Sequence, residues 1–495
     1  MLANKKKPFI VVCVFVWGAL GSSFGSSVFG QDANAFEPSA QQPSTQQPSE
    51  QRQQQSQNRA TIVANLAREI DDLIPTDYLT DTAKAQALKA IANSFVDGNT
   101  AAVDQQLKSL ADRDPDFPPA ELLKAGMHYS INDIKGGGEL LESLAIKEPG
   151  NPAVFIAFSR LAYSQQRITD ALALVEKAQA KLQTASSSAG SKKFMQTQVA
   201  DLLTLIAVQQ NRLPDADKYA EAWEKLAPSS AKMLLGRAEI KYLQKDLPAA
   251  QQFLAKLKQA RPSSRPAEVI LASWSQTRGD AAGVAKWIKS AVAKYPDDAA
   301  VQLEYANWAL SVEDFKTATA AVAKFESLDK PSLNSKLLRA RVMFSNQDYV
   351  NAEKLLDELF VARSSSFDIS NLYVLTLIES SDAEKQKKAS QIAQRNLQAL
   401  PNNLVARAAI GWVLFKSGDV KNGSTILAGI ARSNELPPEV TFFVASMLEQ
   451  IGQNTKAQKL LEPALKSKGM FLYRSRSKQM YDRLSSSELP APSKK

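Results

Sequence analysis

Between about residue 61 and residue 465, apolar side chains recur at the i, i+3, i+4 spacing that gives a helix one apolar face. Short polar turns interrupt this pattern at regular intervals. The clearest turn residues lie 34 positions apart, at Asp246, Asp280, Asp314 and Asp348. Because each of them lies between two helix-like stretches, the pattern predicts pairs of amphipathic helices repeated along the chain.

Two further kinds of residue recur at the same 34-residue spacing, and we call each such series of positions a column. A small residue follows most turn residues by four positions, where it lets the second helix of a pair approach the first closely. A proline follows six of the turn residues by sixteen positions and ends the second helix, because proline lacks an N–H and clashes with the preceding turn. Eleven units can be phased in this way, with turn residues at Asn99, Asp133, Arg167, Arg212, Asp246, Asp280, Asp314, Asp348, Lys385, Asp419 and Gln453.

Two steps between turn residues are longer than 34. The step of 45 from Arg167 to Arg212 contains a Ser- and Gly-rich insertion at 184–193. The step of 37 from Asp348 to Lys385 is assigned to an insertion near 364–367. We expect the first insertion to divide the array into a section of three units and a section of eight.

These columns resemble the tetratricopeptide repeat family over about 61–465, and the best matches are residues 244–262, 278–296 and 417–427. The large aromatic that the family carries early in its first helix is mostly missing. The resemblance implies an all-α, right-handed superhelical solenoid of about eleven degenerate helix-turn-helix repeats, whose stacked units share one core. One more amphipathic helix is predicted within 468–484, where its apolar residues would cap the end of the stack.

The N-terminal region is typical of an exported bacterial protein. Residues 1–30 have the charged start, the apolar stretch at 9–20 and the small-residue end of a secretory signal peptide, and we expect cleavage before Gln31. The alternative is an uncleaved N-terminal membrane anchor. Residues 31–60, rich in Gln, Pro and Ser, are interpreted as a disordered linker. The protein is therefore expected in the periplasm or outside the cell.

Little in the sequence indicates catalysis. The single cysteine, Cys13, lies in the predicted signal peptide, so the mature chain has no thiol for a disulfide or a metal site. The single histidine, His128, has no second His or Cys to join it at a metal. The glycines at 136–138 lack the spacing of a phosphate-binding loop. We therefore expect no enzymatic activity, no cofactor and no metal.

In the tetratricopeptide family the concave groove is lined mainly by first-helix residues, and the phasing above says which residues these would be here. Aromatic and arginine side chains are favoured at contact surfaces, because they bury large areas or make fork-shaped hydrogen bonds. Each of them could instead pack between units. The candidate partner-binding residues are Arg160, Tyr163, Glu239, Tyr242, Asn307, Arg341, Phe344, Trp412 and Phe415.

A second candidate surface is the basic C-terminal end, residues 466–495. Ten Lys or Arg against three acidic residues lie within 456–495, so this end carries most of the formal net charge of +9. An export signal argues against nucleic acid, and leaves an anionic envelope polymer or a lipid surface as the ligand. The alternative is that these residues form a solvated helix that caps the stack and have no binding role. The basic residues singled out are Arg474, Arg476, Lys478 and Arg483.

The sequence thus predicts an exported protein-protein interaction scaffold that binds a protein or peptide segment along the concave face of a solenoid. The alternative is binding of an anionic polymer or a membrane surface through the basic end.

Overall fold

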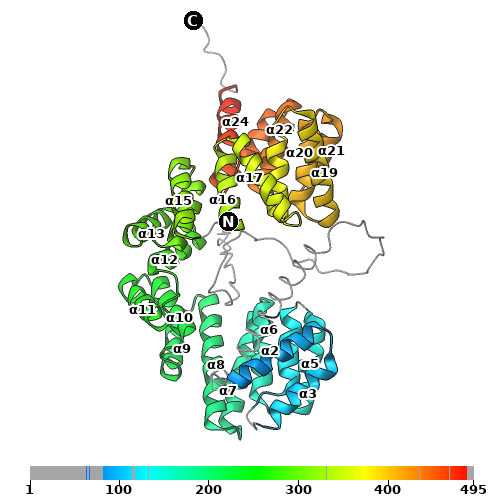
Figure 1. Ribbon diagram of the computed structural model, residues 1–495. Helices are drawn as coiled ribbons and strands as arrows, with labels where there is room; N and C mark the ends of the chain where they lie inside the picture. Colours follow the sequence, from blue (N-terminus) through cyan, green and yellow to red (C-terminus); the bar gives the residue numbers. More distant parts are fainter. Residues whose placement is uncertain are drawn as a thin grey trace, which may run out of the picture. The chain divides into compact units, whose positions relative to one another are not determined.

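The computed structural model describes residues 63, 66, 82–113, 117–131, 133–329, 332–433, 435–467 and 469–487. In this part of the chain every regular element is an α-helix (Figure 1). The chain divides into two compact units, which we call unit 1 (Met1–Ser264) and unit 2 (Arg265–Lys495).

The helices of unit 1 are α2 (Thr82–Val96), α3 (Thr100–Ala111), α4 (Ala120–Ser130), α5 (Ile134–Lys147), α6 (Pro152–Ser164), α7 (Ile168–Thr184), α8 (Ala189–Gln209), α9 (Leu213–Leu226), α10 (Ala231–Leu243) and α11 (Leu247–Ala260). The helices of unit 2 are α12 (Ala267–Thr277), α13 (Ala281–Lys294), α14 (Ala299–Ser311), α15 (Phe315–Leu328), α16 (Leu333–Ser345), α17 (Tyr349–Ala362), α18 (Phe367–Leu377), α19 (Ala383–Ala399), α20 (Leu404–Lys416), α21 (Val420–Ile430), α22 (Pro438–Gln450), α23 (Asn454–Lys466) and α24 (Arg474–Ser487).

The helices pack as eleven consecutive pairs, from α2 with α3 to α22 with α23, and α24 packs on α23. The prediction of an all-α solenoid of about eleven helical hairpins is confirmed. In unit 2 the first helices of neighbouring pairs, from α14 to α22, also contact one another, and the second helices do so far less. The stack of unit 2 therefore curves with its first helices inside. We call the surface formed by α14, α16, α18, α20 and α22 the inner face of unit 2.

The aspartates of the 34-residue column are the N-caps of the second helices. The carboxylate of Asp246 accepts from the backbone N–H of Ala249 at 3.1 Å, and that of Asp314 accepts from Thr317 at 3.0 Å. The residue before the cap has left-handed backbone, as in Lys245 at φ 65°. The column recurs because each second helix starts with N–H groups that have no intrahelical partner, and a short carboxylate satisfies one of them.

The small-residue column is explained by close contact between the two helices of a pair. A Cβ built on Gly137 would lie 2.5 Å from the ring of Tyr129, and one built on Gly423 would lie 2.5 Å from the backbone nitrogen of Phe415. Gly423 on α21 thus packs directly on the backbone of α20. The three glycines at 136–138 belong to the start of α5, as the repeat phase predicts.

The two longer steps are accommodated differently from each other. The insertion at 184–193 lengthens α7 to 17 residues and α8 to 21. These two helices pack against each other, so this point is not a boundary; the division between the units lies at Ser264 and Arg265 instead. It falls in a segment with Pro262 and Pro266, which interrupt the helical pattern.

The placement of the second insertion near 364–367 is wrong. The N-cap of α19 is Asp382, 34 residues after Asp348, and Lys385 lies in the first turn of α19. The buried alanine of α19 is nevertheless Ala389, 37 residues after Ala352. The three extra residues therefore lie between Asp382 and Ala389, at the start of α19, and make this helix 17 residues long against 14 for α17.

Several predictions concern residues outside the described part of the chain. They are the signal peptide at 1–30, the linker at 31–60, and the tail beyond residue 487. Within the described residues, no helix combines the length and the apolar character needed to cross a membrane.

Candidate binding face on the first helices

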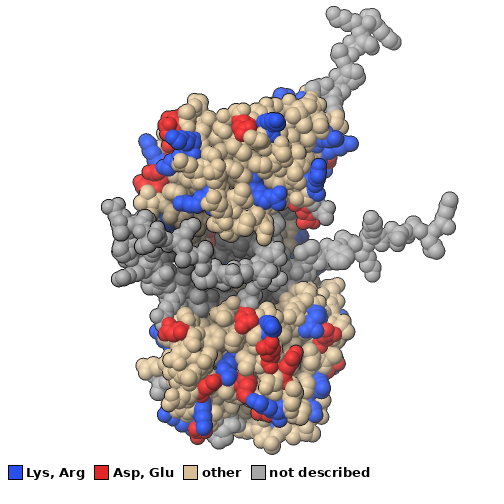
Figure 2. All heavy atoms as spheres, turned by 90° about the vertical axis from the view of Figure 1, so that its right-hand side faces the viewer, with Lys and Arg blue, Asp and Glu red and all other residues tan. Residues whose placement is uncertain are grey.

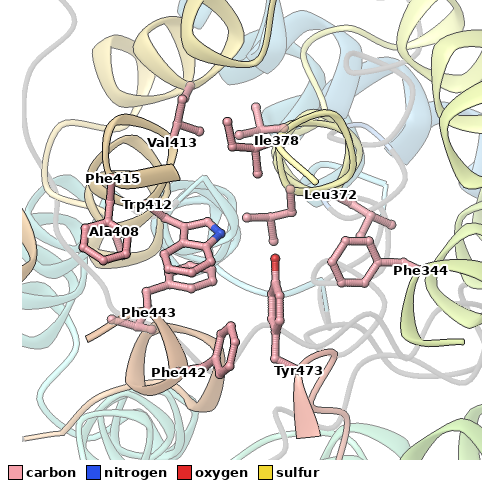
Figure 3. Close-up of a cluster of buried hydrophobic side chains, with 14 of the residues drawn as sticks. Phe344, Leu372, Ile378, Ala408, Trp412, Val413, Phe415, Phe442, Phe443 and Tyr473 are labelled. Atoms are coloured by element: carbon pink, nitrogen blue, oxygen red, sulfur yellow. The ribbon is translucent and has the colours of Figure 1, made fainter. Parts of the chain in front are cut away.

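The inner face of unit 2 is occupied by residues 470–476 of the same chain, which we call the C-terminal segment. Tyr473 is 1% exposed and lies among aromatic side chains of the first helices (Figure 3). Its ring stacks on Phe442 with centroids 4.6 Å apart, and it meets Phe344 edge-on at 5.3 Å. The aromatic rings that contact Tyr473 thus come from α16 and α22, which are three repeats apart.

Trp412 forms the other side of this aromatic cluster. It stacks on Phe443 at 4.8 Å and on Phe415 at 5.7 Å, and it meets Phe442 edge-on (Figure 3). Aromatic pairs of this kind add about 0.5–1.5 kcal/mol each beyond the area they bury. The cluster therefore holds the C-terminal segment firmly at Tyr473.

Three carboxylates surround the C-terminal segment. Glu379, with a side chain only 7% exposed, receives a hydrogen bond of 2.7 Å from the guanidinium of Arg476. Glu439 accepts from the backbone N–H of Leu472 at 3.1 Å, and Glu313 accepts from the hydroxyl of Ser475.

These carboxylates come from widely separated parts of unit 2. Glu313 lies in the turn after α14, Glu379 in the turn between α18 and α19, and Glu439 in the first turn of α22. Burial raises the pKa of Glu439, against the smaller opposing effects of its hydrogen bonds and of nearby arginines. A charged carboxylate at this position is thus only partly compensated by its surroundings.

The loop before α24 directs the C-terminal segment inward. The guanidinium of Arg474 donates to the carbonyl oxygens of Leu465, Ser467 and Gly469 at 2.9, 3.1 and 2.9 Å. These three bonds tie the loop to the start of α24. Gly469 has φ 114°, a conformation that residues with a Cβ rarely adopt, so the chain reverses here at little cost.

The rest of α24 caps the stack. Met480 and Leu484 are buried, and the guanidinium of Arg483 pairs with Glu449 at the end of α22 at 2.7 Å. The predicted capping helix is thus present. Tyr473, which lies in the stretch where the sequence predicts the cap, instead reaches the inner face.

The predicted residues of unit 2 differ in their accessibility. Phe344, Trp412 and Phe415 are 1, 2 and 9% exposed and belong to the aromatic cluster. Arg341 is half-buried with its guanidinium 3.6 Å from Asp368, and burial lowers its pKa. Asn307 is half-buried on α14.

In unit 1 the predicted residues surround a carboxylate that sequence reasoning missed. Asp201 on α8 is 3% exposed; Lys232 of α10 donates to it at 2.7 Å, and Arg160 of α6 lies 3.8 Å away. Burial, together with the charges of Glu239 and Asp201, raises the pKa of Tyr163 to about 12. Asp201 is the only charged residue within 194–208, and this isolation in an apolar stretch was the available signal.

Tyr242, the last of the predicted residues in unit 1, is half-buried near the end of α10. The first helices α6, α8 and α10 thus carry a polar cluster, whereas the inner face of unit 2 carries an aromatic one.

The basic end is largely neutralised by neighbours within the chain. Arg476 and Arg483 pair with Glu379 and Glu449, and Lys478 pairs with Asp482 at 2.9 Å. Figure 2 shows acidic and basic side chains interspersed over the described surface on the side of the molecule that lies at the right of Figure 1. The positive charge of this end does not form an isolated patch on α24.

His128 has a structural environment. Its Nδ1 lies 2.7 Å from the carboxylate of Asp133, the N-cap of α5, and its ring meets that of Phe95 edge-on. Among the described residues, no group of three or more His, Cys, Asp or Glu side chains is placed to hold a metal ion.

No protein-family model matches this chain, and no curated protein matches it either. Similar solved structures include a tetratricopeptide repeat protein from Parabacteroides merdae, with 11% identity, 52% of this chain and 98% of that chain covered, and a TM-score of 0.40. Yeast Tom70 has 13% identity, 81% and 96% coverage, and a TM-score of 0.33. YrrB, described as a TPR protein with an unusual peptide-binding site, has 18% identity, 41% and 98% coverage, and a TM-score of 0.25.

At these identities and TM-scores the likeness carries no argument about ligands. The fold assignment rests on the chain itself: eleven packed helical hairpins, mostly 34 residues apart, with a side-chain cap on most second helices and a small residue at the contact in most pairs. By these features, the chain is a tetratricopeptide-type solenoid.

Proposed function

We propose that this protein is an exported scaffold that binds a segment of a partner protein along the first helices of its repeats. The observation that carries the proposal is the occupied inner face of unit 2. One short segment there is held by an aromatic cluster and by carboxylates from three alternate repeats of the stack, those of α14, α18 and α22. A surface built in this way can recognise a peptide by one anchor and several polar contacts.

The first helices of unit 1 supply a second, polar part of this surface. Arg160, Asp201 and Lys232 connect α6, α8 and α10 through ion pairs. A segment lying across these helices would meet alternating charges at short spacing. Such an arrangement favours selectivity and orientation of the partner more than raw affinity.

The proposed export rests on the signal-like residues 1–30 and the linker-like residues 31–60. Binding of an anionic polymer through the basic end is not favoured, because its arginines and Lys478 have carboxylate or carbonyl partners within unit 2.

The test is capture of partners from an envelope fraction by residues 31–495, compared between variants. Arg160→Ala and Arg341→Ala remove first-helix side chains of the proposed surface. Arg339→Ala is the matched control, since Arg339 lies on α16 beside Arg341 but pairs with Glu326 of α15 at 3.0 Å.

The proposal predicts a discrete partner at moderate salt that the control variant retains and that at least one of the other two variants loses. Equal capture by all variants would overturn it. Capture only at low salt, lost on deletion of 488–495, would assign binding to the basic tail instead.

A further inference from the structure

We propose that the C-terminal segment is an internal mimic of the partner, and that the inner face of unit 2 binds a helix-starting segment with an aromatic residue followed three positions later by an arginine. This inference rests on the proposed function and names the class of partner for one of its two surfaces. Tyr473 and Arg476 have this spacing in the chain itself.

The spacing has a geometric reason. The backbone N–H of Ser477 donates to the carbonyl of Tyr473 at 2.8 Å, so Tyr473 to Ser477 form the first turn of α24. Residues three apart on a helix share one side. The guanidinium of Arg476 accordingly lies 5.1 Å from the ring centre of Tyr473 and 5.2 Å from that of Phe442, while it pairs with Glu379. The aromatic ring and the cation therefore bind as one unit.

The face is complementary to a positively charged ligand. Glu313, Glu379 and Glu439 all have oxygen atoms hydrogen-bonded to the C-terminal segment. Arg476 forms an ion pair with Glu379, while Arg341 and Arg474 act on Glu439 through their charge. Lys416 approaches Glu379 from the face itself, at 3.7 Å. Buried carboxylates are costly unless a cation or several donors accompany them, which selects for a basic ligand.

A purely structural cap would not need these carboxylates. α24 packs on α23, with Met480 and Leu484 buried and a hydrogen bond from Gln458 to Ser485. The C-terminal segment adds contacts further along the inner face, at Phe344 and Glu313. Its removal from the face would leave the capping contacts of α24 in place.

An internal occupant weakens the apparent affinity of the partner for the inner face. While the C-terminal segment occupies the face, a competing ligand binds with its intrinsic dissociation constant divided by the small fraction of open molecules. Weakening the internal contacts raises that fraction and tightens binding from outside by the same factor. A variant with weaker internal contacts should therefore bind an external peptide more tightly than wild type does.

The experiment measures binding of a fluorescein-labelled peptide with the sequence of residues 470–487 to the full mature chain, by fluorescence anisotropy. Three forms of the protein are compared: wild type, Arg476→Glu, and Lys478→Glu. The last is the matched control, because it makes the same charge change on an exposed side chain two residues away that pairs only with Asp482 in this structure. Arg476→Gln is a milder variant to use if Arg476→Glu does not fold.

We expect the peptide to bind the Arg476→Glu chain at least tenfold more tightly than it binds either wild type or the Lys478→Glu control. Peptides carrying Tyr473→Ala or Arg476→Glu should bind that chain at least tenfold more weakly than the unaltered peptide. Circular dichroism establishes that each protein is folded.

Three results would overturn the inference. If the folded variants and wild type all fail to bind, the C-terminal segment is a permanent part of unit 2; the capture experiment with Arg160 and Arg341 would still stand, so the two failures are distinguishable. If all forms bind equally, the peptide uses another surface. A wild-type dimer that Arg476→Glu dissociates would make a second copy the occupant.

Discussion

Because α21 contacts α20 closely, we predict that replacing two glycines of α21 by alanine has opposite effects on stability. A Cβ on Gly423 would lie 2.5 Å from the nitrogen and 2.8 Å from the Cα of Phe415, and 2.8 Å from the carbonyl oxygen of Gly411. These are backbone atoms, so no rotamer change can relieve the overlap, and the two helices must move apart. Gly429, six residues on, has nothing within 4 Å of its Cβ position.

The magnitudes follow from two competing effects. Replacing a helical glycine by alanine stabilises the helix by about 0.5–1 kcal/mol, because it reduces the conformational entropy of the unfolded chain. Overpacking in a tight contact costs typically about 1–3 kcal/mol. We expect Gly429→Ala to raise the free energy of unfolding of unit 2 by up to about 1 kcal/mol, and Gly423→Ala to lower it by about 1–2 kcal/mol.

The assay is urea unfolding followed by circular dichroism at the helical band, with wild type and both variants at the same protein concentration. The urea dependence of the transition should be unchanged, so that the shift in midpoint reports stability alone. If Gly423→Ala stabilises the protein as much as Gly429→Ala does, the small-residue column does not mark close helix contact, and our account of the repeat is wrong.

Three further predictions concern the caps, the pH dependence and the aromatic anchor. Asp246→Ala should cost about 1 kcal/mol of unfolding free energy and Asp246→Asn much less, as measured by urea unfolding, because only alanine lacks an acceptor for the N–H at the start of α11. A hydrogen bond from Tyr373 and a second one from a neighbouring lysine lower the pKa of Asp357. Its stabilisation is thus complete above the ordinary carboxyl pKa of about 4 and is lost as the pH falls through the lower, folded-state value. Asp357→Asn should therefore flatten the acid side of a stability–pH curve, and an unchanged slope would contradict this. Tyr473→Ala should cost about 3–5 kcal/mol of unfolding free energy, and Tyr481→Ala, which is only half-buried, should cost clearly less in the same titration.

Much of the fold could be predicted because the repeat is a local device. The capping aspartates, the small residues and the closing prolines each act within one hairpin. Their positions in the structure can therefore be predicted from residues close to them in the sequence. The insertion behind the 37-residue step was misplaced because the cap and the buried alanine of this hairpin are not at their usual spacing. Lys385 is in phase with the buried Ala389, and nothing in the sequence shows that Asp382 caps a helix that starts three residues earlier.

The inner face was only half predictable. Repeat phase places Phe344 and Trp412 on first helices correctly, because that assignment depends on a fixed offset from the turn residue. It does not reveal that Tyr473 packs against Phe344, since the curvature that brings α16 and α22 together is the sum of small angles between repeats. The same long-range contact turns Arg476 from an apparently free basic residue into the partner of Glu379.

The most direct test of the central claim is a cross-link that reports whether the C-terminal segment lies on the inner face. Residues 31–495 contain no cysteine, so Ser475→Cys and Glu313→Cys can be combined and treated with a short bis-maleimide, with each single variant as the control. Ser475 and Glu313 contact each other, although 162 positions separate them in the sequence. We predict rapid cross-linking within single molecules, and loss of partner capture in the cross-linked form if the segment must leave for the partner to bind. Failure of the folded double variant to cross-link would show that the segment does not occupy the face, and our account of this binding surface would be contradicted.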